Sequence, residues 1–248
     1  MESTGAARLA AQAGARTGAG LVTVASPSDA LTVNAAALTD IMVRQSNGVE
    51  GLEALLIDQR RNAVVLGPGA GIGSTTRGQV KLVLESGRAA VLDADALTSF
   101  EGDAVALAAY VKQSGAGQTV ITPHDGEFSR LFNQQSEILE AKDRLSRARK
   151  AAAFLGLVVV FKGPDTVIAA PDGRAALSMN GTPWLATAGS GDVLAGAIGG
   201  LLAQGHQSFE AAAAGVWLHA EAGRSIGPGL MAHDLPVALL SVIGRLLA

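Results

Sequence analysis

The feature that most constrains the fold is a repeated order of short apolar strands that run straight into loops of glycine or polar residues. Strands are predicted at 63–66, 89–92, 119–121 and 157–161, and helical patterns follow the first three loops. This alternation predicts an α/β protein with a mostly parallel sheet. Because open α/β sheets bind ligands beyond the carboxyl ends of their strands, these loops are the first candidates for a functional site.

The expected architecture has three layers, in which helices cover both faces of the central sheet. Of the 248 residues, 48% are hydrophobic and only 4% are aromatic, a composition that suits close packing of helices on a sheet. The absence of a linker-like stretch favours one domain over residues 1–248. A turn at 171–173 predicts a hairpin. Residues 136–156 predict one long amphipathic helix whose charges, including Arg144, face solvent.

Charge and composition exclude several classes of function. The net charge is −3 and the basic residues form no stripe, which argues against a nucleic-acid surface. The chain has no cysteine, so disulfides, thiolate chemistry and cysteine-based zinc sites are excluded. No apolar run reaches the roughly 18 residues that span a bilayer, and no signal-peptide pattern stands at the N-terminus. We therefore expect a cytoplasmic protein with no membrane or nucleic-acid partner.

A glycine-rich segment at 186–192 leads into an apolar helical pattern that extends to residue 204. Glycines at a helix N-terminus let unpaired backbone N–H groups approach a phosphate, and the helix dipole favours the same anion. Asp192 falls in the first turn, where its carboxylate would repel an anion. It is therefore interpreted as a general base that accepts a proton from a hydroxyl group. The alternative is that Asp192 only caps the helix and the glycines only permit close packing.

The strand-end loops supply further candidates, each with a structural alternative. Asp93 and Asp95 either hold Mg²⁺ through water or cap the next helix. His124 is either functional or structural. Lys162 leaves a buried strand beside a glycine, where it either meets a nucleotide phosphate or extends its ammonium group to solvent. The 67–71 loop matches a dinucleotide fingerprint only weakly, so packing against a substrate's phosphate or amide is favoured there.

Six motifs occur in the order of one known family and span nearly the whole chain. They are GPGAG (67–71), LDADAL (92–97), TPHDGE (122–127), KGPDT (162–166), NGTPWLATAGSGDVLAGAIGGLLAQG (180–205) and GLMAHDLP (229–236). Together they resemble the ADP/ATP-dependent NAD(P)H-hydrate dehydratases, members of the ribokinase-like superfamily. The GSGD sequence alone is shared with thiazole, pyridoxal and sugar kinases of that superfamily, whereas TPHDGE and KGPDT make the resemblance specific.

The resemblance implies a metabolite-repair lyase. Its substrate is the (6S) hydrate of NADH or NADPH, and its phosphoryl donor is ADP, or ATP, with Mg²⁺. Phosphorylation of the ring hydroxyl and loss of phosphate would restore NADH or NADPH and leave AMP from ADP. The resemblance also implies a homo-oligomer, a tetramer. A ribokinase-like small-molecule kinase and an inert nucleotide-binding relative are the alternatives.

The match to the family's motifs also implies the roles of individual residues. Asp192 is implied to be the catalytic residue. Nucleotide contacts are implied at Lys162, Gly163, Pro164, Asp165, Thr166, Asn180, Gly189, Ser190 and Gly191. Contacts with the hydrated dinucleotide are implied at Ala6, Gly69, Gly71, His124 and Asp192.

Two features depart from the family's pattern. Asp125 stands where the family has a proline, which brings a negative charge near a phosphate-bearing ligand unless the side chain points away. Family members also begin with a strand that ends in a Gly-Gly-Ser loop, before the segment equivalent to Ser3–Ala6. Either the given sequence is trimmed, its start is misassigned, or the sheet lacks its first strand, which would expose an edge or leave a groove open.

Overall fold

The strands of the computed structural model, which describes residues 4–115 and 118–247, form one six-stranded sheet and one two-stranded sheet. The larger sheet has the order β3 (Ala63–Leu66), β4 (Ala89–Leu92), β5 (Thr119–Ile121), β6 (Val158–Phe161), β7 (Val167–Ala169) and β8 (Ala175–Leu177). The first four strands are parallel, and β7 and β8 form the predicted antiparallel hairpin. The strand predictions at 63–66, 89–92 and 119–121 are confirmed residue by residue.

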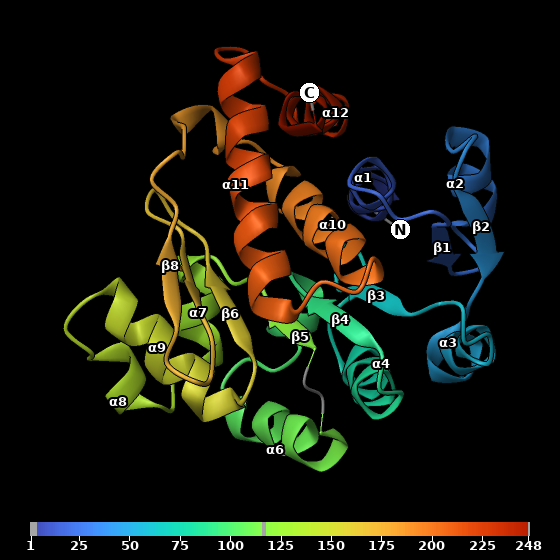
Figure 1. Ribbon diagram of the computed structural model, residues 1–248. Coiled ribbons are helices and arrows are strands. Elements are labelled where there is room, and N and C mark those ends of the chain that lie inside the picture. Colours follow the sequence, from blue (N-terminus) through green and yellow to red (C-terminus); the bar gives the residue numbers. More distant parts are fainter. Residues whose placement is uncertain (1–3, 116–117, 248) are drawn as a thin grey trace.

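Helices cover both faces of the six-stranded sheet (Figure 1). One face packs on α10 (Ser190–Ala203) and α11 (Ser208–Ile226). The other packs on α4 (Ser74–Glu85), α6 (Ala104–Ser114), α7 (Asp125–Leu131) and α9 (Arg144–Leu155). Successive strand residues alternate between these two cores: Val120 and Val158 face α10 and α11, whereas Ile121 and Val159 face the opposite layer. The predicted three-layer α/β architecture is thereby confirmed.

The remaining elements extend the two helical layers and connect the strands. On the α10 side, α1 (Thr4–Arg16) and α12 (Leu235–Leu247) complete a third apolar cluster. The other elements are α2 (Leu31–Ala37), α3 (Gly48–Leu56), α5 (Asp95–Thr98), α8 (Ser136–Leu139) and two short 3₁₀ turns, η1 (Pro183–Leu185) and η2 (Ala232–Asp234). Across the described residues, no helix has both the length and the hydropathy needed to cross a bilayer.

The smaller sheet is separate from the six-stranded sheet. It consists of β1 (Thr23–Ser26) and β2 (Met42–Gln45), paired in parallel. Within the described residues no strand pairing joins the smaller sheet to β3. The expected lack of a first strand stays a prediction. The segment at Ser3 that bears on that expectation lies outside the described residues.

The prediction of one helix over 136–156 is wrong. The chain ends α8 at Leu139 and begins α9 at Arg144. Asp143 is extended and accepts a hydrogen bond from the backbone N–H of Ser146 at 2.7 Å, so it caps a new helix. The break matters for the site, because it turns Arg144 from a mid-helix surface residue into the first residue of α9.

Helix α1 packs closely on α10 through residues without bulky side chains. A Cβ at Gly196 would overlap the backbone of Ala10, and one at Gly200 would overlap Gly14. The hydroxyl of Thr17 donates to the carbonyl oxygen of Ala197 at 3.2 Å, which ties the two helices further. The alanine-rich face of α1 is therefore used inside the subunit.

This packing predicts opposite effects for two glycine-to-alanine changes in helices. Gly196→Ala should lower the free energy of unfolding by ~2 kcal/mol or more, because the methyl group overlaps the backbone of α1. Gly244→Ala meets nothing within 4 Å in α12 and should raise stability by ~0.5 kcal/mol through helix propensity. Urea unfolding of both variants measures the difference. Equal effects would contradict the close approach of α1 and α10.

Candidate active site

The loops that follow β3, β4, β5 and β6 meet at one end of the sheet, beside the N-terminus of α10. Gly67, with a φ of +127°, lies so close to the backbone oxygen of Asp93 that a Cβ would overlap it. The backbone N–H of Gly71 donates to Asp95 Oδ2 at 2.8 Å. Between the two acids, Ala94 has a φ of +47°, a strained conformation for a residue with a Cβ. This bend gives Asp93 and Asp95 separate partners.

Lys162 is the centre of a buried ionic cluster. Its Nζ lies 2.8 Å from Asp93 Oδ1 and 3.7 Å from Glu127 Oε2. Burial opposes the charge of the ammonium group, but the carboxylates of Asp93 and Glu127 outweigh it and raise the pKa of Lys162. A Cβ built on Gly191 would lie 3.3 Å from the same Nζ, so the cluster lies against the first turn of α10.

Asp192 lies in that first turn and has the electrostatics of a base. Burial raises the pKa of its carboxyl group to about 6, and nearby Asp93 adds to the rise while Lys162 opposes it. The N-cap of α10 is Gly189, in a left-handed conformation with a φ of +89° and without a side-chain capping bond. Within the described residues the start of α10 has no side-chain capping hydrogen bond, which argues against the capping alternative for Asp192.

A buried hydroxyl–imidazole pair supports the start of α10 from behind. Ser190 Oγ lies 3.1 Å from His219 Nε2, and both residues are buried. Burial lowers the pKa of His219 to about 4, so the ring is neutral at pH 7. Gly189 packs against Leu9 of α1 and Ala232 of η2. The first turn of α10 is therefore held by three other elements, and Ala6, one turn before Leu9, lies on the helix that reaches it.

His124 has a structural role that the structure defines. Its Nδ1 accepts hydrogen bonds from the N–H groups of Gly126 and Glu127, and Glu127 Oε2 accepts one from the N–H of His124. This reciprocal arrangement is a capping box at the start of α7. The side chain is 53% exposed, and its Nε2 lies 3.6 Å from Glu127 Oε1. The exposed part of the ring is accessible to solvent or a ligand. Both interpretations of His124 are thus compatible with its position.

The 162–166 loop is ordered by its own bonds and by the turn at 180–181. Thr166 Oγ1 donates to the carbonyl oxygen of Gly163 at 3.0 Å and closes the loop. A Cβ at Gly181 would lie 3.1 Å from the carbonyl oxygen of Pro164, so the turn packs against the loop. Asn180 itself donates to Glu221 Oε1 at 2.9 Å and to the carbonyl oxygen of Trp217 at 3.2 Å. The amide of Asn180 therefore anchors the turn to α11.

Two features of the candidate site were not predicted from the sequence. The first is the Asp93–Lys162–Glu127 cluster, whose members come from the loop after β4, the end of β6 and the first turn of α7. The second is Arg144, which was expected to face solvent but whose side chain is only 22% exposed and contacts two of the loops. Gly69 and Gly71 lie where they were predicted, exposed on the loop after β3.

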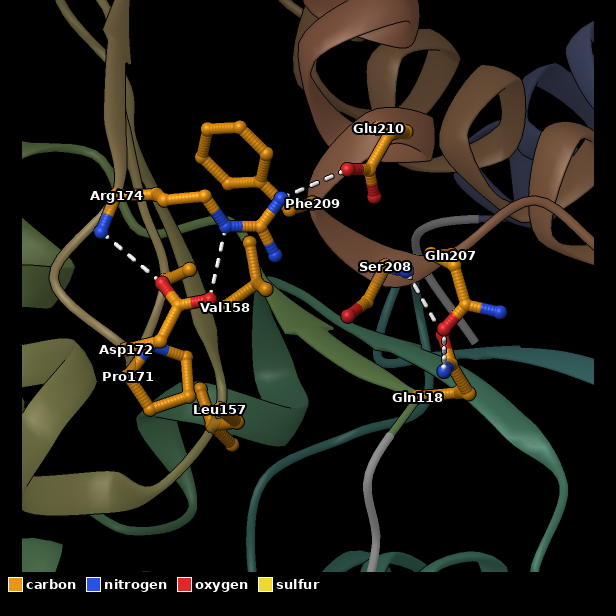
Figure 2. Close-up of a pocket in the computed structure, with 11 residues that line it drawn as sticks. Gln118, Leu157, Val158, Pro171, Asp172, Arg174, Gln207, Ser208, Phe209 and Glu210 are labelled. Carbon is orange, nitrogen blue, oxygen red and sulfur yellow. Dashed lines mark hydrogen bonds and ion pairs between the residues drawn. The ribbon is translucent and has the colours of Figure 1, made fainter.

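A separate pocket lies at the opposite end of the sheet (Figure 2). It is lined by residues before β5 and β6, by the β7–β8 turn and by the start of α11. Its polar groups bond to one another: Arg174 pairs with Asp172 and Glu210, and Gln118 accepts from the N–H of Ser208. The pocket contains none of the predicted site residues.

Sequence comparison places these loops in a known family. A sequence model of the NAD(P)H-hydrate dehydratase family matches residues 1–243. An ADP-dependent (S)-NAD(P)H-hydrate dehydratase of Neisseria meningitidis is 37% identical over 246 residues, which cover 95% of this chain and 79% of that protein. A bifunctional NAD(P)H-hydrate repair enzyme of Moorella thermoacetica is 40% identical over 229 residues. These cover 89% of this chain, but the chain spans only 42% of that longer relative.

Solved structures agree with the sequence comparison. The ADP/ATP-dependent NAD(P)H-hydrate dehydratase of Bacillus subtilis, co-crystallised with ATP and Mg²⁺, is 28% identical with a TM-score of 0.77 and covers 97% of this chain and 87% of that one. A hydroxyethylthiazole kinase of Pyrococcus horikoshii, at 19% identity and a TM-score of 0.62, covers 94% of this chain and 93% of its own. That second likeness shows the shared fold alone. The match over nearly the whole chain and the converging motif loops show that this chain belongs to the NAD(P)H-hydrate dehydratase family.

Proposed function

We propose that this protein is a lyase that dehydrates the (S) hydrate of NADH or NADPH at the expense of ADP. The observation that carries the proposal is Asp192, a half-buried carboxylate with a raised pKa of about 6 beside the glycine-rich start of α10. The loops that follow β3, β4, β5 and β6 meet beside this helix start. The substrate and the nucleotide in this proposal are taken from the names of the chain's relatives.

The chemistry follows from the difference between two leaving groups. A hydroxyl group on the nicotinamide ring leaves poorly, whereas a phosphate leaves readily. Asp192 accepts the proton of the ring hydroxyl while the hydroxyl oxygen attacks the terminal phosphorus of ADP, and AMP departs. The carbon–oxygen bond then breaks, phosphate leaves, a neighbouring ring carbon loses a proton and the double bond is restored.

The start of α10 has the geometry to stabilise the transferred phosphoryl group. The N–H groups of Gly189 and Gly191 are at the positive end of the helix dipole, where developing negative charge is favoured. The N–H of Ser190, predicted with them, already donates to the carbonyl oxygen of Thr187 at 3.3 Å. Lys162 lies beside Gly191 and adds a positive charge near the first turn of α10. Residues 163–166 and the turn at Asn180 would bind the rest of the nucleotide. Gly69, Gly71, His124 and Ala6 would contact the hydrated dinucleotide.

The carboxylate oxygens near the first turn of α10 suit Mg²⁺, because this ion prefers hard oxygen ligands. In the parts of the chain that the structure describes, no three His, Cys, Asp or Glu side chains form a preformed metal cage. Mg²⁺ commonly binds through one or two carboxylates together with substrate phosphates. Of the two acids predicted to hold Mg²⁺, Asp93 is paired with Lys162 at 2.8 Å. We therefore propose that Asp95 contributes to a site completed by the nucleotide, where the ion would neutralise phosphate charge.

Two further proposals come from the family resemblance. A homotetramer would give a molecular mass of four 25.0 kDa chains in sedimentation velocity. A cytoplasmic location would be seen by fluorescence of the tagged chain. The second activity named for the bifunctional relatives is outside the proposal, since this chain spans only 42% of the Moorella protein.

Replacing Asp192 with asparagine tests the proposed base. Asp192→Asn should lower the rate of NADH recovery from hydrated NADH, ADP and Mg²⁺ by about 10²–10⁴-fold, because the amide cannot accept the proton. The dissociation constant for ADP should change little. Absorbance at the NADH band and calorimetric titration measure the two quantities. Failure of the unaltered protein to restore NADH with either ADP or ATP would refute the function, and a stable phosphorylated product would indicate a kinase.

The pH profile gives an independent test of the same carboxylate. Because Asp192 must be ionised to accept a proton and its pKa is raised to about 6, the turnover rate should rise with pH below about 6 and level off above it. Phosphate release between pH 5 and 8 measures the profile, with ADP affinity determined at each pH as the control. A rate that stays flat down to pH 5 would exclude Asp192 as the base.

Two substitutions separate the capping role of His124 from a role in binding. His124→Ala should cost ~1 kcal/mol of stability because the capping bonds are lost, whereas His124→Asn should retain most of it. Both should raise KM for the hydrated dinucleotide while KM for ADP stays constant. Thermal unfolding and steady-state kinetics measure the effects. Full activity of His124→Asn would show that the ring serves only as a cap.

A further inference from the structure

Arg144 lies across the carboxyl end of β6, although it belongs to α9. Its guanidinium stacks on Phe161, with Cζ 3.8 Å from the ring centroid. Nη2 donates to the carbonyl oxygen of Lys162 at 2.8 Å. These contacts fix the guanidinium at the point where β6 becomes the 162–166 loop, and they explain why only 22% of the side chain is exposed.

Two carboxylates from different loops share this guanidinium. Asp125 Oδ1 lies 2.5 Å from Nη1, and Asp165 Oδ1 lies 3.4 Å from Nε. The buried Nε has no hydrogen-bond partner in the described structure, so Asp165 is held by charge rather than by a hydrogen bond. Both carboxylates are more than half exposed, at 63% and 54%. The guanidinium of Arg144 therefore pairs with one carboxylate from the 122–127 loop and one from the 162–166 loop.

The lack of a side chain at Gly163 makes room for this arrangement. A Cβ built on Gly163 would overlap Nη2 of Arg144. The close approach brings the positive charge within the loop that follows Lys162. The loop and the arginine are thus matched in shape as well as in charge.

We propose that Arg144 is a positioning residue for the nucleotide site, which cancels the charges of Asp125 and Asp165 so that a nucleoside diphosphate can approach the 162–166 loop. The inference rests on the nucleotide site of the proposed function. Without Arg144, two carboxylates would face an incoming polyphosphate without compensation, and like charges repel over these distances. Asp125, the departure from the family's proline, is tolerated here because its charge is directed to Arg144.

Direct titration with ADP tests the inference without any catalytic assay. Arg144→Ala should raise the dissociation constant for ADP about tenfold, a loss typical of a charge-assisted contact. Arg149→Ala is the matched control, because Arg149 is an exposed residue of the same helix and the change in net charge is the same. The control should bind ADP like the unaltered chain.

Removing Asp125 separates charge compensation from a purely structural role. Asp125→Asn should lower the dissociation constant for ADP about twofold at low salt, and the gain should disappear at 1 M salt, where charges are screened. Added to Arg144→Ala, it should recover part of the lost affinity. A structural clamp predicts the reverse in both cases, since Asp125→Asn would then weaken ADP binding. Because Asp125 is exposed, Asp125→Asn distinguishes charge compensation from a structural clamp even if Arg144→Ala fails to fold.

The results distinguish failure of this inference from failure of the proposed function. Equal ADP affinity in folded Arg144→Ala and the unaltered chain, or weaker affinity in Asp125→Asn, would overturn the role of Arg144 alone. No ADP binding by the unaltered chain would overturn the inference together with the nucleotide part of the function. ADP binding that responds as predicted without NADH recovery would keep the inference and reject the dehydratase.

Discussion

The contact between Lys162 and Asp93, 2.8 Å long and buried, is the interaction on which the rest of the site depends. A buried ammonium group needs partners, because the loss of hydration costs several kcal/mol per ion. Those partners come from the loop after β4 and from α7. Pairing the charge of Lys162 therefore brings these two segments to the end of β6. The same charges act on Asp192, where burial and Asp93 raise the pKa to about 6 and Lys162 limits the rise. The same group of charges therefore holds the loops together and sets the pKa of the proposed base.

The small residues of α1 and α10 have a second consequence beyond close packing. Since no side chain separates the two helices at Gly196 and Gly200, α1 reaches the start of α10 and places Leu9 against Gly189. The neutral His219 holds Ser190 from α11. The glycine-rich turn that would meet a phosphate is thus supported by rigid helices, which is what a preorganised anion site requires.

Strands and helices were predicted best where one local sequence pattern was not opposed by another. The strands at 63–66, 89–92 and 119–121 were predicted correctly because short apolar runs end at clear turn residues. The break between α8 and α9 was not predicted, because amphipathic spacing continues across residues 140–143 while the cap at Asp143 competes with it. Arg144 was assigned to solvent for the same reason. Its contacts with Phe161, Asp125 and Asp165 depend on residues far away in the sequence.

The sequence by itself determined the α/β class, the order of the motif loops, the family and the residue types available for chemistry. It did so because strand periodicity, turn residues and glycine-rich helix starts are local properties of the chain. Only the tertiary structure decided which charges meet. The pairing of Lys162 with Asp93 and Glu127, the raised pKa of Asp192 and the sharing of Arg144 between two loops all depend on distance and burial. Those quantities are fixed when the strands align in one sheet and their loops are brought to the same end.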